Sequence, residues 1–170
     1  MDARPSTETI TQLASDALAG TGVVVDAASL QQAGRRRLVR VFLARDLSDL
    51  APDDASSTVE PLTLDEVAHA TRTVSDALDD SDHMGQAPYT LEVSSAGLDR
   101  PLTTHDQLRR NVGRLVKLTL ADGTTTTDRI TSVGPHALSL ETAPDAPVPL
   151  ADVTKALVQV EFSRPDGKDD

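Results

Sequence analysis

The period of the hydrophobic pattern changes near residue 94, and this change most restricts what the chain can fold into. Before it, two stretches with helical spacing alternate with three strand-like runs. After it, five short strand-like runs follow one another with turn signals between them. The 170 residues suffice for one domain or two small ones, and the two patterns favour two.

The pattern predicts an α+β protein in four segments. We expect an N-terminal α/β domain over 1–94, an interdomain junction over 95–102, a C-terminal SH3-like or Sm-like barrel over 103–165, and a frayed tail over 166–170. The first domain is expected to run α-β-β-α-β, which implies a small sheet with helices packed against it.

The second expected helix has the clearest signals in the first domain. Thr63 can cap it through its hydroxyl, and Glu66 can reach back to the Thr63 amide in a capping box. The apolar spacing predicts this buried stripe: Leu64, Val67, Ala68, Thr71, Val74 and Leu78. An earlier helix, capped by Ser6 or Thr7, is expected to end near Gly20 or Gly22.

Strands of the first domain are expected at Val23 to Val25, Leu38 to Arg45 and Tyr89 to Val93. Between the second of these strands and the second helix, Leu47 to Pro61 is rich in Pro, Asp and Ser and is expected to be a mobile loop.

Short strands dominate the second domain. A helical turn is expected near Thr104 to Arg110, and Asp122-Gly123 predicts a tight hairpin before a strand over Thr124 to Val133. Pro144 to Pro149 is expected to be a loop, Asp152 to cap a helical turn, and Val158 to Phe162 to form the last strand. This order is typical of an SH3-like barrel.

Composition excludes several classes of protein. Without cysteine there is no disulfide, thiolate metal site or cysteine nucleophile. The histidines lack metal-ligand spacing, and no motif predicts a cofactor. No apolar run could span a membrane and no signal peptide is seen, so we expect a cytoplasmic protein.

Charge is distributed unevenly in this chain of net charge −11. Residues 1–94 carry 7 basic and 16 acidic side chains, whereas residues 95–170 carry 9 and 11. Two basic clusters stand against this acidity, and their members are Arg35, Arg36, Arg37 and Arg40, and Arg100, Arg109, Arg110, Arg114 and Lys117. With only three aromatic residues, base stacking is disfavoured, so RNA contact would be to phosphates through these arginines.

The segment from Tyr89 to Leu102 has the form of a structured junction. A strand ends near Val93, Gly97 supplies backbone freedom, and Arg100-Pro101 forces an extended exit. A plain interdomain linker would also fit these residues. A small hydrolase using Ser94 or Ser95 would need a histidine base brought close by folding.

This junction resembles the signature of the ribosome maturation factor RimP family. The junction residues that carry the resemblance are Leu91, Glu92, Val93, Ser94, Ser95, Gly97, Leu98, Asp99, Arg100 and Pro101. Ala96 stands where the family usually has proline, which would fix one backbone angle. Similar stretches at Arg37 to Leu43, Leu62 to Asp79, Arg109 to Arg114 and Val148 to Ala156 extend the resemblance over most of residues 10–162.

The resemblance implies a non-enzymatic assembly factor of the small ribosomal subunit. Such a factor binds immature subunits and helps to load the twelfth small-subunit ribosomal protein, a strongly basic protein. It implies no cofactor, and we expect a monomer. The residues expected to contact rRNA phosphates are Arg35, Arg36, Arg37, Arg100, Arg109, Arg110, Arg114 and Lys117. The alternative is a general protein-interaction adaptor whose small barrel binds a peptide.

Overall fold

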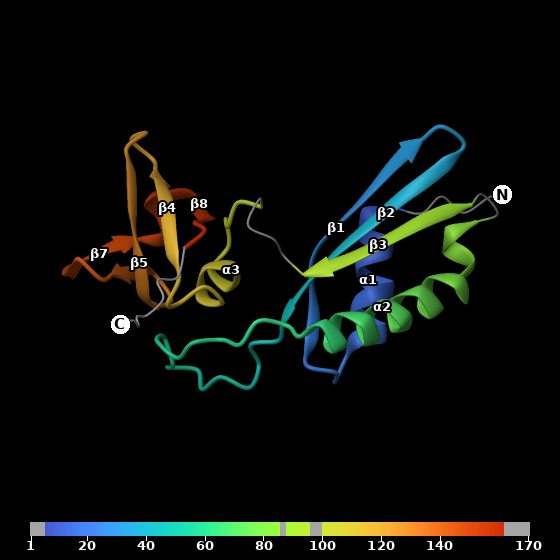
Figure 1. The fold of residues 1–170 in the computed structure, drawn as a ribbon, viewed down its shortest axis with the longest axis horizontal. Helices are drawn as coiled ribbons and strands as arrows, with labels where there is room; N and C mark the ends of the chain where they lie inside the picture. Colours follow the sequence, from blue (N-terminus) through green and yellow to red (C-terminus); the bar gives the residue numbers. More distant parts are fainter. Residues whose placement is uncertain (1–5, 86–87, 96–99, 162–170) are drawn as a thin grey trace, which may run out of the picture. The chain divides into compact units, whose positions relative to one another are not determined.

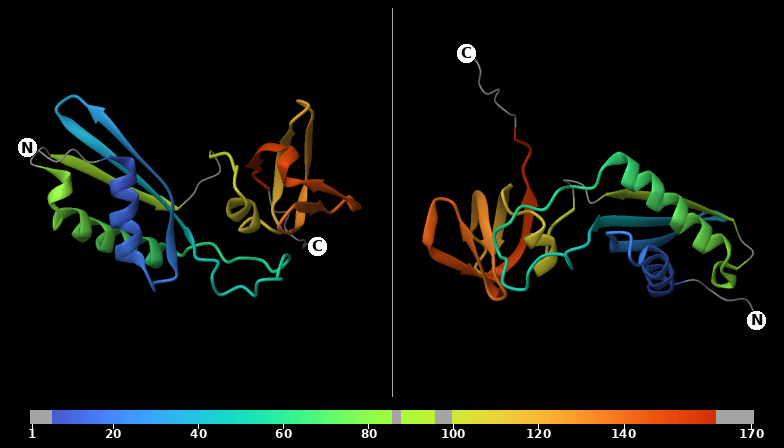
Figure 2. Two further views of the ribbon diagram at one scale, coloured as in Figure 1. Left: turned by 180° about the vertical axis from the view of Figure 1, so that it is seen from behind. Right: turned by 90° about the horizontal axis from the view of Figure 1, so that it is seen from below.

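The chain forms two compact units in a computed structural model that describes residues 6–85, 88–95 and 100–161 (Figures 1 and 2). The first unit comprises Met1–Asp46 and Glu60–Gly97, and the second comprises Leu47–Val59 and Leu98–Asp170. The predicted division gave all of 1–94 to one domain, whereas the contacts group Leu47–Val59 with the second unit. The predicted tail 166–170 and junction residues 96–99 lie outside the described residues.

The first unit has the predicted α-β-β-α-β order. Its elements are α1 (Thr7–Leu18), β1 (Val23–Ala33), β2 (Arg36–Arg45), α2 (Leu64–Asp79), the 3₁₀ turn η1 (Asp82–Met84) and β3 (Tyr89–Ser95). The sheet order is β1-β2-β3, with β1 antiparallel and β3 parallel to the central β2. A parallel neighbour requires a crossover connection, and α2 lies on the connection between β2 and β3.

Both helices of the first unit begin as the sequence predicts. The Ser6 hydroxyl accepts a hydrogen bond from the Thr9 amide at 3.1 Å. The capping box of α2 is complete: the Glu66 amide donates to Thr63 Oγ1 at 3.0 Å, and the Thr63 amide donates to Glu66 Oε1 at 2.9 Å. Gly20, just beyond α1, adopts a φ of 80° that favours glycine.

The two helices contact one another and pack on one face of the sheet (Figures 1 and 2). The buried core residues are Ile10, Ala14, Leu18, Val23, Val39, Val41, Leu43, Ala70, Val74, Leu78 and Met84. The predicted stripe of α2 is wrong in part, because Leu64 is 88% exposed and Ala68 is also exposed, whereas Ala70 is buried. Val74 and Leu78 are buried as predicted, and Ala70, one turn before Val74, completes the buried stripe in place of Leu64 and Ala68.

The acidic C-terminal end of α2 has a partner in β3. The Tyr89 hydroxyl donates to Asp79 Oδ1 at 2.6 Å. Burial raises the pKa of Tyr89 above its usual range, and the hydrogen bond to Asp79 raises it further. This contact gives Asp79 a donor at the helix end where the backbone dipole disfavours a carboxylate.

The second unit is built on five antiparallel strands. Its elements are α3 (His105–Arg109), β4 (Leu115–Leu120), β5 (Thr125–Val133), β6 (Ala137–Leu140), β7 (Ala143–Pro149), the 3₁₀ turn η2 (Leu150–Asp152) and β8 (Val153–Val158). Their order in the sheet is β7-β6-β5-β4-β8. Among the described residues no ladder joins β7 to β8, so the closed barrel that was predicted is not observed.

Three details of the second unit differ from the sequence prediction. Pro144 to Pro149, expected as a loop, lies in β7, an edge strand where proline need not donate to a ladder. Asp152 does not cap η2 but is its last residue. The last strand starts at Val153 and ends at Val158, earlier than expected, and Phe162 lies outside the described residues.

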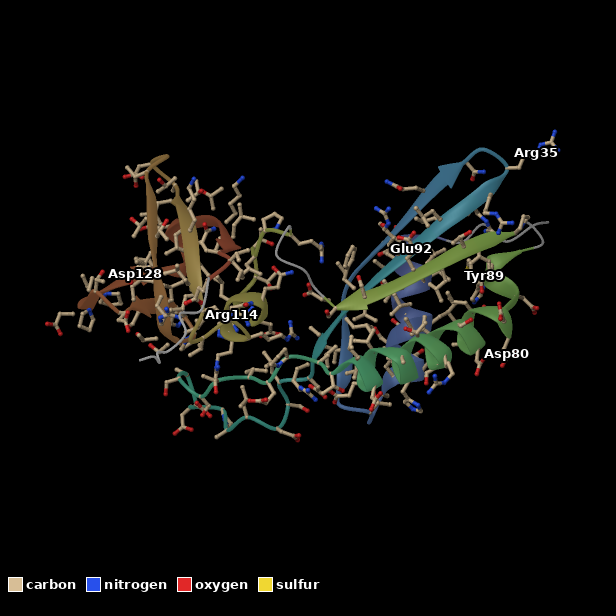
Figure 3. All side chains as sticks on the ribbon, viewed as in Figure 1. Arg35, Asp80, Tyr89, Glu92, Arg114 and Asp128 are labelled. Carbon is tan, nitrogen blue, oxygen red and sulfur yellow. The ribbon has the colours of Figure 1, made fainter. Side chains whose placement is uncertain are left out.

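The second unit has its own apolar core and a buried carboxylate, that of Asp128. The buried core residues are Leu102, Leu108, Val112, Val116, Leu118, Ile130, Val133, Leu138, Leu140, Ala156 and Val158. Asp128 on β5 accepts hydrogen bonds from the hydroxyl and amide of Thr142 and from the Arg129 amide (Figure 3). These donors, the Thr142 hydroxyl first, lower the pKa of Asp128 below its ordinary value.

Candidate functional site

The first basic cluster lies at the β1–β2 hairpin. Arg35 is exposed beside the Gly34 turn, at the end of the hairpin (Figure 3). Arg36 is exposed and donates to the Tyr89 carbonyl at 3.4 Å. Arg37, by contrast, is only 8% exposed. Of these three predicted phosphate contacts, Arg35 and Arg36 present charge to solvent and Arg37 does not.

Arg40 lies on β2 beside Glu92 on β3. The parallel register pairs the two residues, and Arg40 Nε approaches Glu92 Oε1 at 2.9 Å. Both side chains are about half exposed, so the pair is worth only about 0–1 kcal/mol. Glu92, a residue of the predicted junction, therefore neutralises part of the first basic cluster.

The members of the second basic cluster differ strongly in exposure. Arg114, just before β4, and Lys117, on β4, are both exposed (Arg114 is labelled in Figure 3). Arg100 and Arg110 are half-buried. Arg109 is only 2% exposed. The prediction that Arg109 contacts rRNA does not fit this structure, because a buried guanidinium cannot reach a phosphate.

Arg109 instead holds the segment Leu47–Val59 on the second unit. Its guanidinium donates to the Asp54 carbonyl at 3.3 Å, to the Ser57 carbonyl at 2.5 Å and to Asp54 Oδ1 at 3.2 Å. A planar guanidinium suits such a set of acceptors better than an ammonium group would. We call Leu47–Val59 the strap, because its flanks on both sides belong to the first unit and the strap itself belongs to the second.

The strap is also ordered by its own hydrogen bonds. Asp54 Oδ1 accepts from the amides of Ser56 and Ser57 at 3.1 and 2.9 Å. Hydrogen bonds from Ser57, then the Ser56 amide and the charge of Arg109, lower the pKa of Asp54. The Val133 amide, at the end of β5, donates to the Ala55 carbonyl at 2.8 Å. The strap is a loop, as its composition predicts, and these hydrogen bonds hold it at several points.

A close contact with Gly113 adds to the packing of the strap. Gly113 has a φ of 93°, and a Cβ added there would lie 3.3 Å from Thr58 Cγ2. We expect Gly113→Ala to destabilise the second unit by about 1–2 kcal/mol through backbone strain, and also to loosen the strap. Gly123→Ala is the matched control, since Gly123 has a similar φ of 87° with nothing within 4 Å.

Amide hydrogen exchange measures this prediction. Both glycine variants should lose global stability, but only Gly113→Ala should speed exchange in the strap relative to the β-strands. Equal exchange of the strap in both variants would contradict a packing role for the Thr58 contact.

Arg45 fixes the root of the strap in the first unit. Its guanidinium makes two bonds to Glu66, from Nη1 to Oε2 at 2.7 Å and from Nη2 to Oε1 at 2.8 Å. It also donates to the carbonyls of Glu60 at 3.1 Å and Pro61 at 3.0 Å. The bond from Arg45 and the Thr63 amide lower the pKa of Glu66 to about 2. One side chain thus ties the end of β2 to the start of α2.

The described junction residues divide between the two units. Leu91 and Val93 pack against the core of the first unit, and Ser94 and Ser95 end β3 exposed. Gly97, Leu98 and Asp99 lie outside the described residues, as does Ala96. Pro101 is exposed and precedes Leu102, a buried residue that exchanges hydrogen bonds with Ala156 at 2.7 and 3.0 Å. The end of the junction thus begins the sheet packing of the second unit.

No catalytic arrangement forms around the two serines in the described part of the chain. Neither Ser94 nor Ser95 has a hydrogen bond to a histidine there, and His105 pairs with Asp106 at 3.0 Å in the other unit. Within the described ranges, no group of three or more metal-ligating residues is present. None of the described helices is long and apolar enough to cross a membrane.

Comparison with known proteins supplies the assignment that geometry alone does not. The family model described as the RimP N-terminal domain matches residues 13–99. The protein named ribosome maturation factor RimP from Kineococcus radiotolerans is 43% identical, in an alignment covering 86% of this chain and 73% of the relative. This chain belongs to the RimP family. The resemblance predicted from the junction is confirmed.

The RimP family match includes the residues that Arg45 and Arg109 contact. The matched range 13–99 contains Arg45 and Glu66, and it also contains the strap. Neither the role of Arg45 nor that of Arg109 was predicted from the sequence, although Asp54 followed by Ser56 and Ser57 is typical of an Asx turn that fixes a loop. No sequence signal distinguished Arg109 from its exposed neighbours, because its acceptors lie more than fifty residues earlier.

Proposed function

We propose that this member of the RimP family is a non-enzymatic assembly factor for the small ribosomal subunit. In this proposal it acts in the cytoplasm, binds immature subunits and helps to load the twelfth small-subunit ribosomal protein. Family membership carries the proposal, since the 43% identical relative is named a ribosome maturation factor. Monomer is the expected state, and neither a cofactor nor a metal is required.

The distribution of charge supports two kinds of contact in this role, one with a basic protein and one with rRNA phosphates. The net charge of −11 favours contact with a basic ribosomal protein and disfavours general binding to nucleic acid. Local cations can still contact rRNA phosphates, and the exposed candidates are Arg35, Arg36, Arg114 and Lys117. Contacts of this kind weaken steeply with salt, which suits a factor that must leave the finished particle.

The architecture of the second unit supports a small-barrel role within the proposal. Five short antiparallel strands, with a 3₁₀ turn before the last one, follow the element order of an SH3-like barrel. We propose that this unit is the SH3-like domain that the resemblance implies, and that it contacts protein and not bases. The chain has too few aromatic residues for base stacking.

Charge reversal tests the rRNA contact. We expect Arg35→Glu with Arg36→Glu, and separately Arg114→Glu with Lys117→Glu, to reduce co-sedimentation with immature small subunits at least tenfold, because each pair replaces attraction to phosphates with repulsion. The difference in co-sedimentation between these variants and the wild type should become smaller at high salt, where attraction to phosphates is screened. Ser15→Glu with Gln31→Glu, both at exposed positions of the first unit, controls for added negative charge.

Unchanged co-sedimentation of both arginine and lysine variants would contradict the phosphate contacts. Failure of the wild-type protein to co-sediment would contradict the assembly role itself and favour the adaptor alternative. Thermal unfolding of each variant checks that the exposed substitutions leave the fold intact.

A further inference from the structure

The strap and the body of the second unit enclose a cleft of about 310 Å³. The strap contributes one wall through Leu47, Leu50, Pro52 and Asp53, among other residues. The opposite wall comes from the first turn of α3, with Asp106, and from the turn between β5 and β6. All of these residues belong to the second unit, so the cleft is a feature of that unit alone.

The walls of this cleft are held in place before any ligand arrives. Arg109 lies at the cleft and fixes the strap through Asp54 and Ser57. The bond from the Val133 amide to the Ala55 carbonyl joins the strap to the end of β5. A surface that is already ordered loses little conformational entropy on binding. The cleft is therefore suited to recognition of a segment that itself must become ordered.

The lining combines apolar side chains with carboxylates. Asp53, Asp54 and Asp106 line the cleft together with Arg109 and His105. Arg109 pairs with Asp54, and His105 Nδ1 lies 3.0 Å from Asp106 Oδ1. The Asp106 side chain is 64% exposed, and Asp53 is exposed. Phosphates would be repelled here, whereas the ammonium or guanidinium group of a partner could reach both carboxylates.

The size of the cleft restricts the occupant further. A volume of about 310 Å³ is at the lower end of the range for ligand pockets and accommodates a few side chains, not a folded surface. Aliphatic stems of lysine and arginine pack on apolar surface while their heads reach acidic groups. The strap-side leucines and proline supply that apolar surface.

We propose that this cleft binds an extended, lysine- or arginine-rich segment of a partner protein. The inference rests on the proposed function, in which the partner is a basic protein of the small subunit, and it assigns the contact to the second unit. In this proposal, part of the acidity of the first half of the sequence acts in the second unit, because the three aspartates of the strap belong to that unit.

Neutralising the cleft tests the proposal. The probe is the purified twelfth small-subunit ribosomal protein, titrated against the full-length chain. We expect Asp53→Asn with Asp106→Asn to weaken binding about tenfold at low salt, with a smaller effect at high salt. The matched control, Asp145→Asn with Asp152→Asn, removes the same charge from exposed positions of β7 and η2 and should leave binding within about twofold.

A second variant tests the apolar part of the cleft. Leu50→Ala should weaken binding by a similar factor at both salt concentrations, because it removes apolar contact and no charge. In hydrogen exchange, the bound ribosomal protein should protect the strap and residues 133–135. Equal affinity of the cleft and control variants, or protection elsewhere only, would overturn the inference.

Co-sedimentation with immature small subunits separates this inference from the proposed function. If the wild-type chain co-sediments but the cleft and control variants bind the ribosomal protein equally well, the assembly role stands and the proposed function of the cleft is wrong. A wild-type chain that fails to co-sediment loses the assembly role, while selective loss of protein binding in the cleft variants would still support the cleft.

Discussion

Arg109→Ala is expected to lower the free energy of unfolding of the second unit by about 3 kcal/mol. The side chain is nearly inaccessible to solvent and donates three hydrogen bonds to the strap. Hydrogen bonds from a charged donor contribute about 1.5–3 kcal/mol each, but water can reach part of the strap after truncation, so the sum is not realised. The strap should then exchange its amide hydrogens much faster than the strands do.

Two further variants show whether the geometry of Arg109 matters. Arg109→Lys retains the charge but cannot span the same acceptors, so we expect an intermediate loss. Arg114→Ala, an exposed arginine of the same unit, should change stability by no more than about 0.5 kcal/mol. Denaturant unfolding followed by hydrogen exchange of second-unit peptides makes the measurement. If Arg109→Ala and Arg114→Ala have equal free energies of unfolding, Arg109 does not anchor the strap.

Local elements of this fold could be predicted because each is encoded by neighbouring residues. The capping box of Thr63 and Glu66 fixes the start of α2 through atoms three residues apart. The alternation in β2 also predicted a strand, and Val39, Val41 and Leu43 are buried. The family was predictable for a similar reason, since the junction is one continuous stretch of sequence.

Features that depend on distant partners could not be predicted in this way. Leu64 is as apolar as any core residue, yet it is 88% exposed, whereas the smaller Ala70 is buried. Arg109 looked like a surface cation because its acceptors in the strap are remote in sequence. The prolines of β7 predicted a loop, since the sequence does not tell which strand lies at an edge.

Glu66→Gln is expected to lower the stability of the first unit at neutral pH and to flatten its dependence on acid. The pKa of Glu66 falls from an ordinary 4.5 to about 2 because Arg45 and the Thr63 amide favour the carboxylate. A carboxyl group with a lowered folded-state pKa stabilises the fold above its unfolded-state pKa. That contribution is therefore complete above about pH 4.5 and is lost as the pH falls towards about 2.

Tyr89 makes this measurement specific to the first unit. It is the single tyrosine of a chain without tryptophan, and it lies on β3. Its fluorescence during urea unfolding, at pH values from neutral down to about 2, should show wild type losing stability faster than Glu66→Gln as acid is added. Glu92→Gln, which removes an exposed ion-pair partner of Arg40, should change neutral-pH stability little. Parallel acid curves for wild type and Glu66→Gln would mean that Arg45 does not hold Glu66 as its carboxylate, and the root of the strap would then need another anchor.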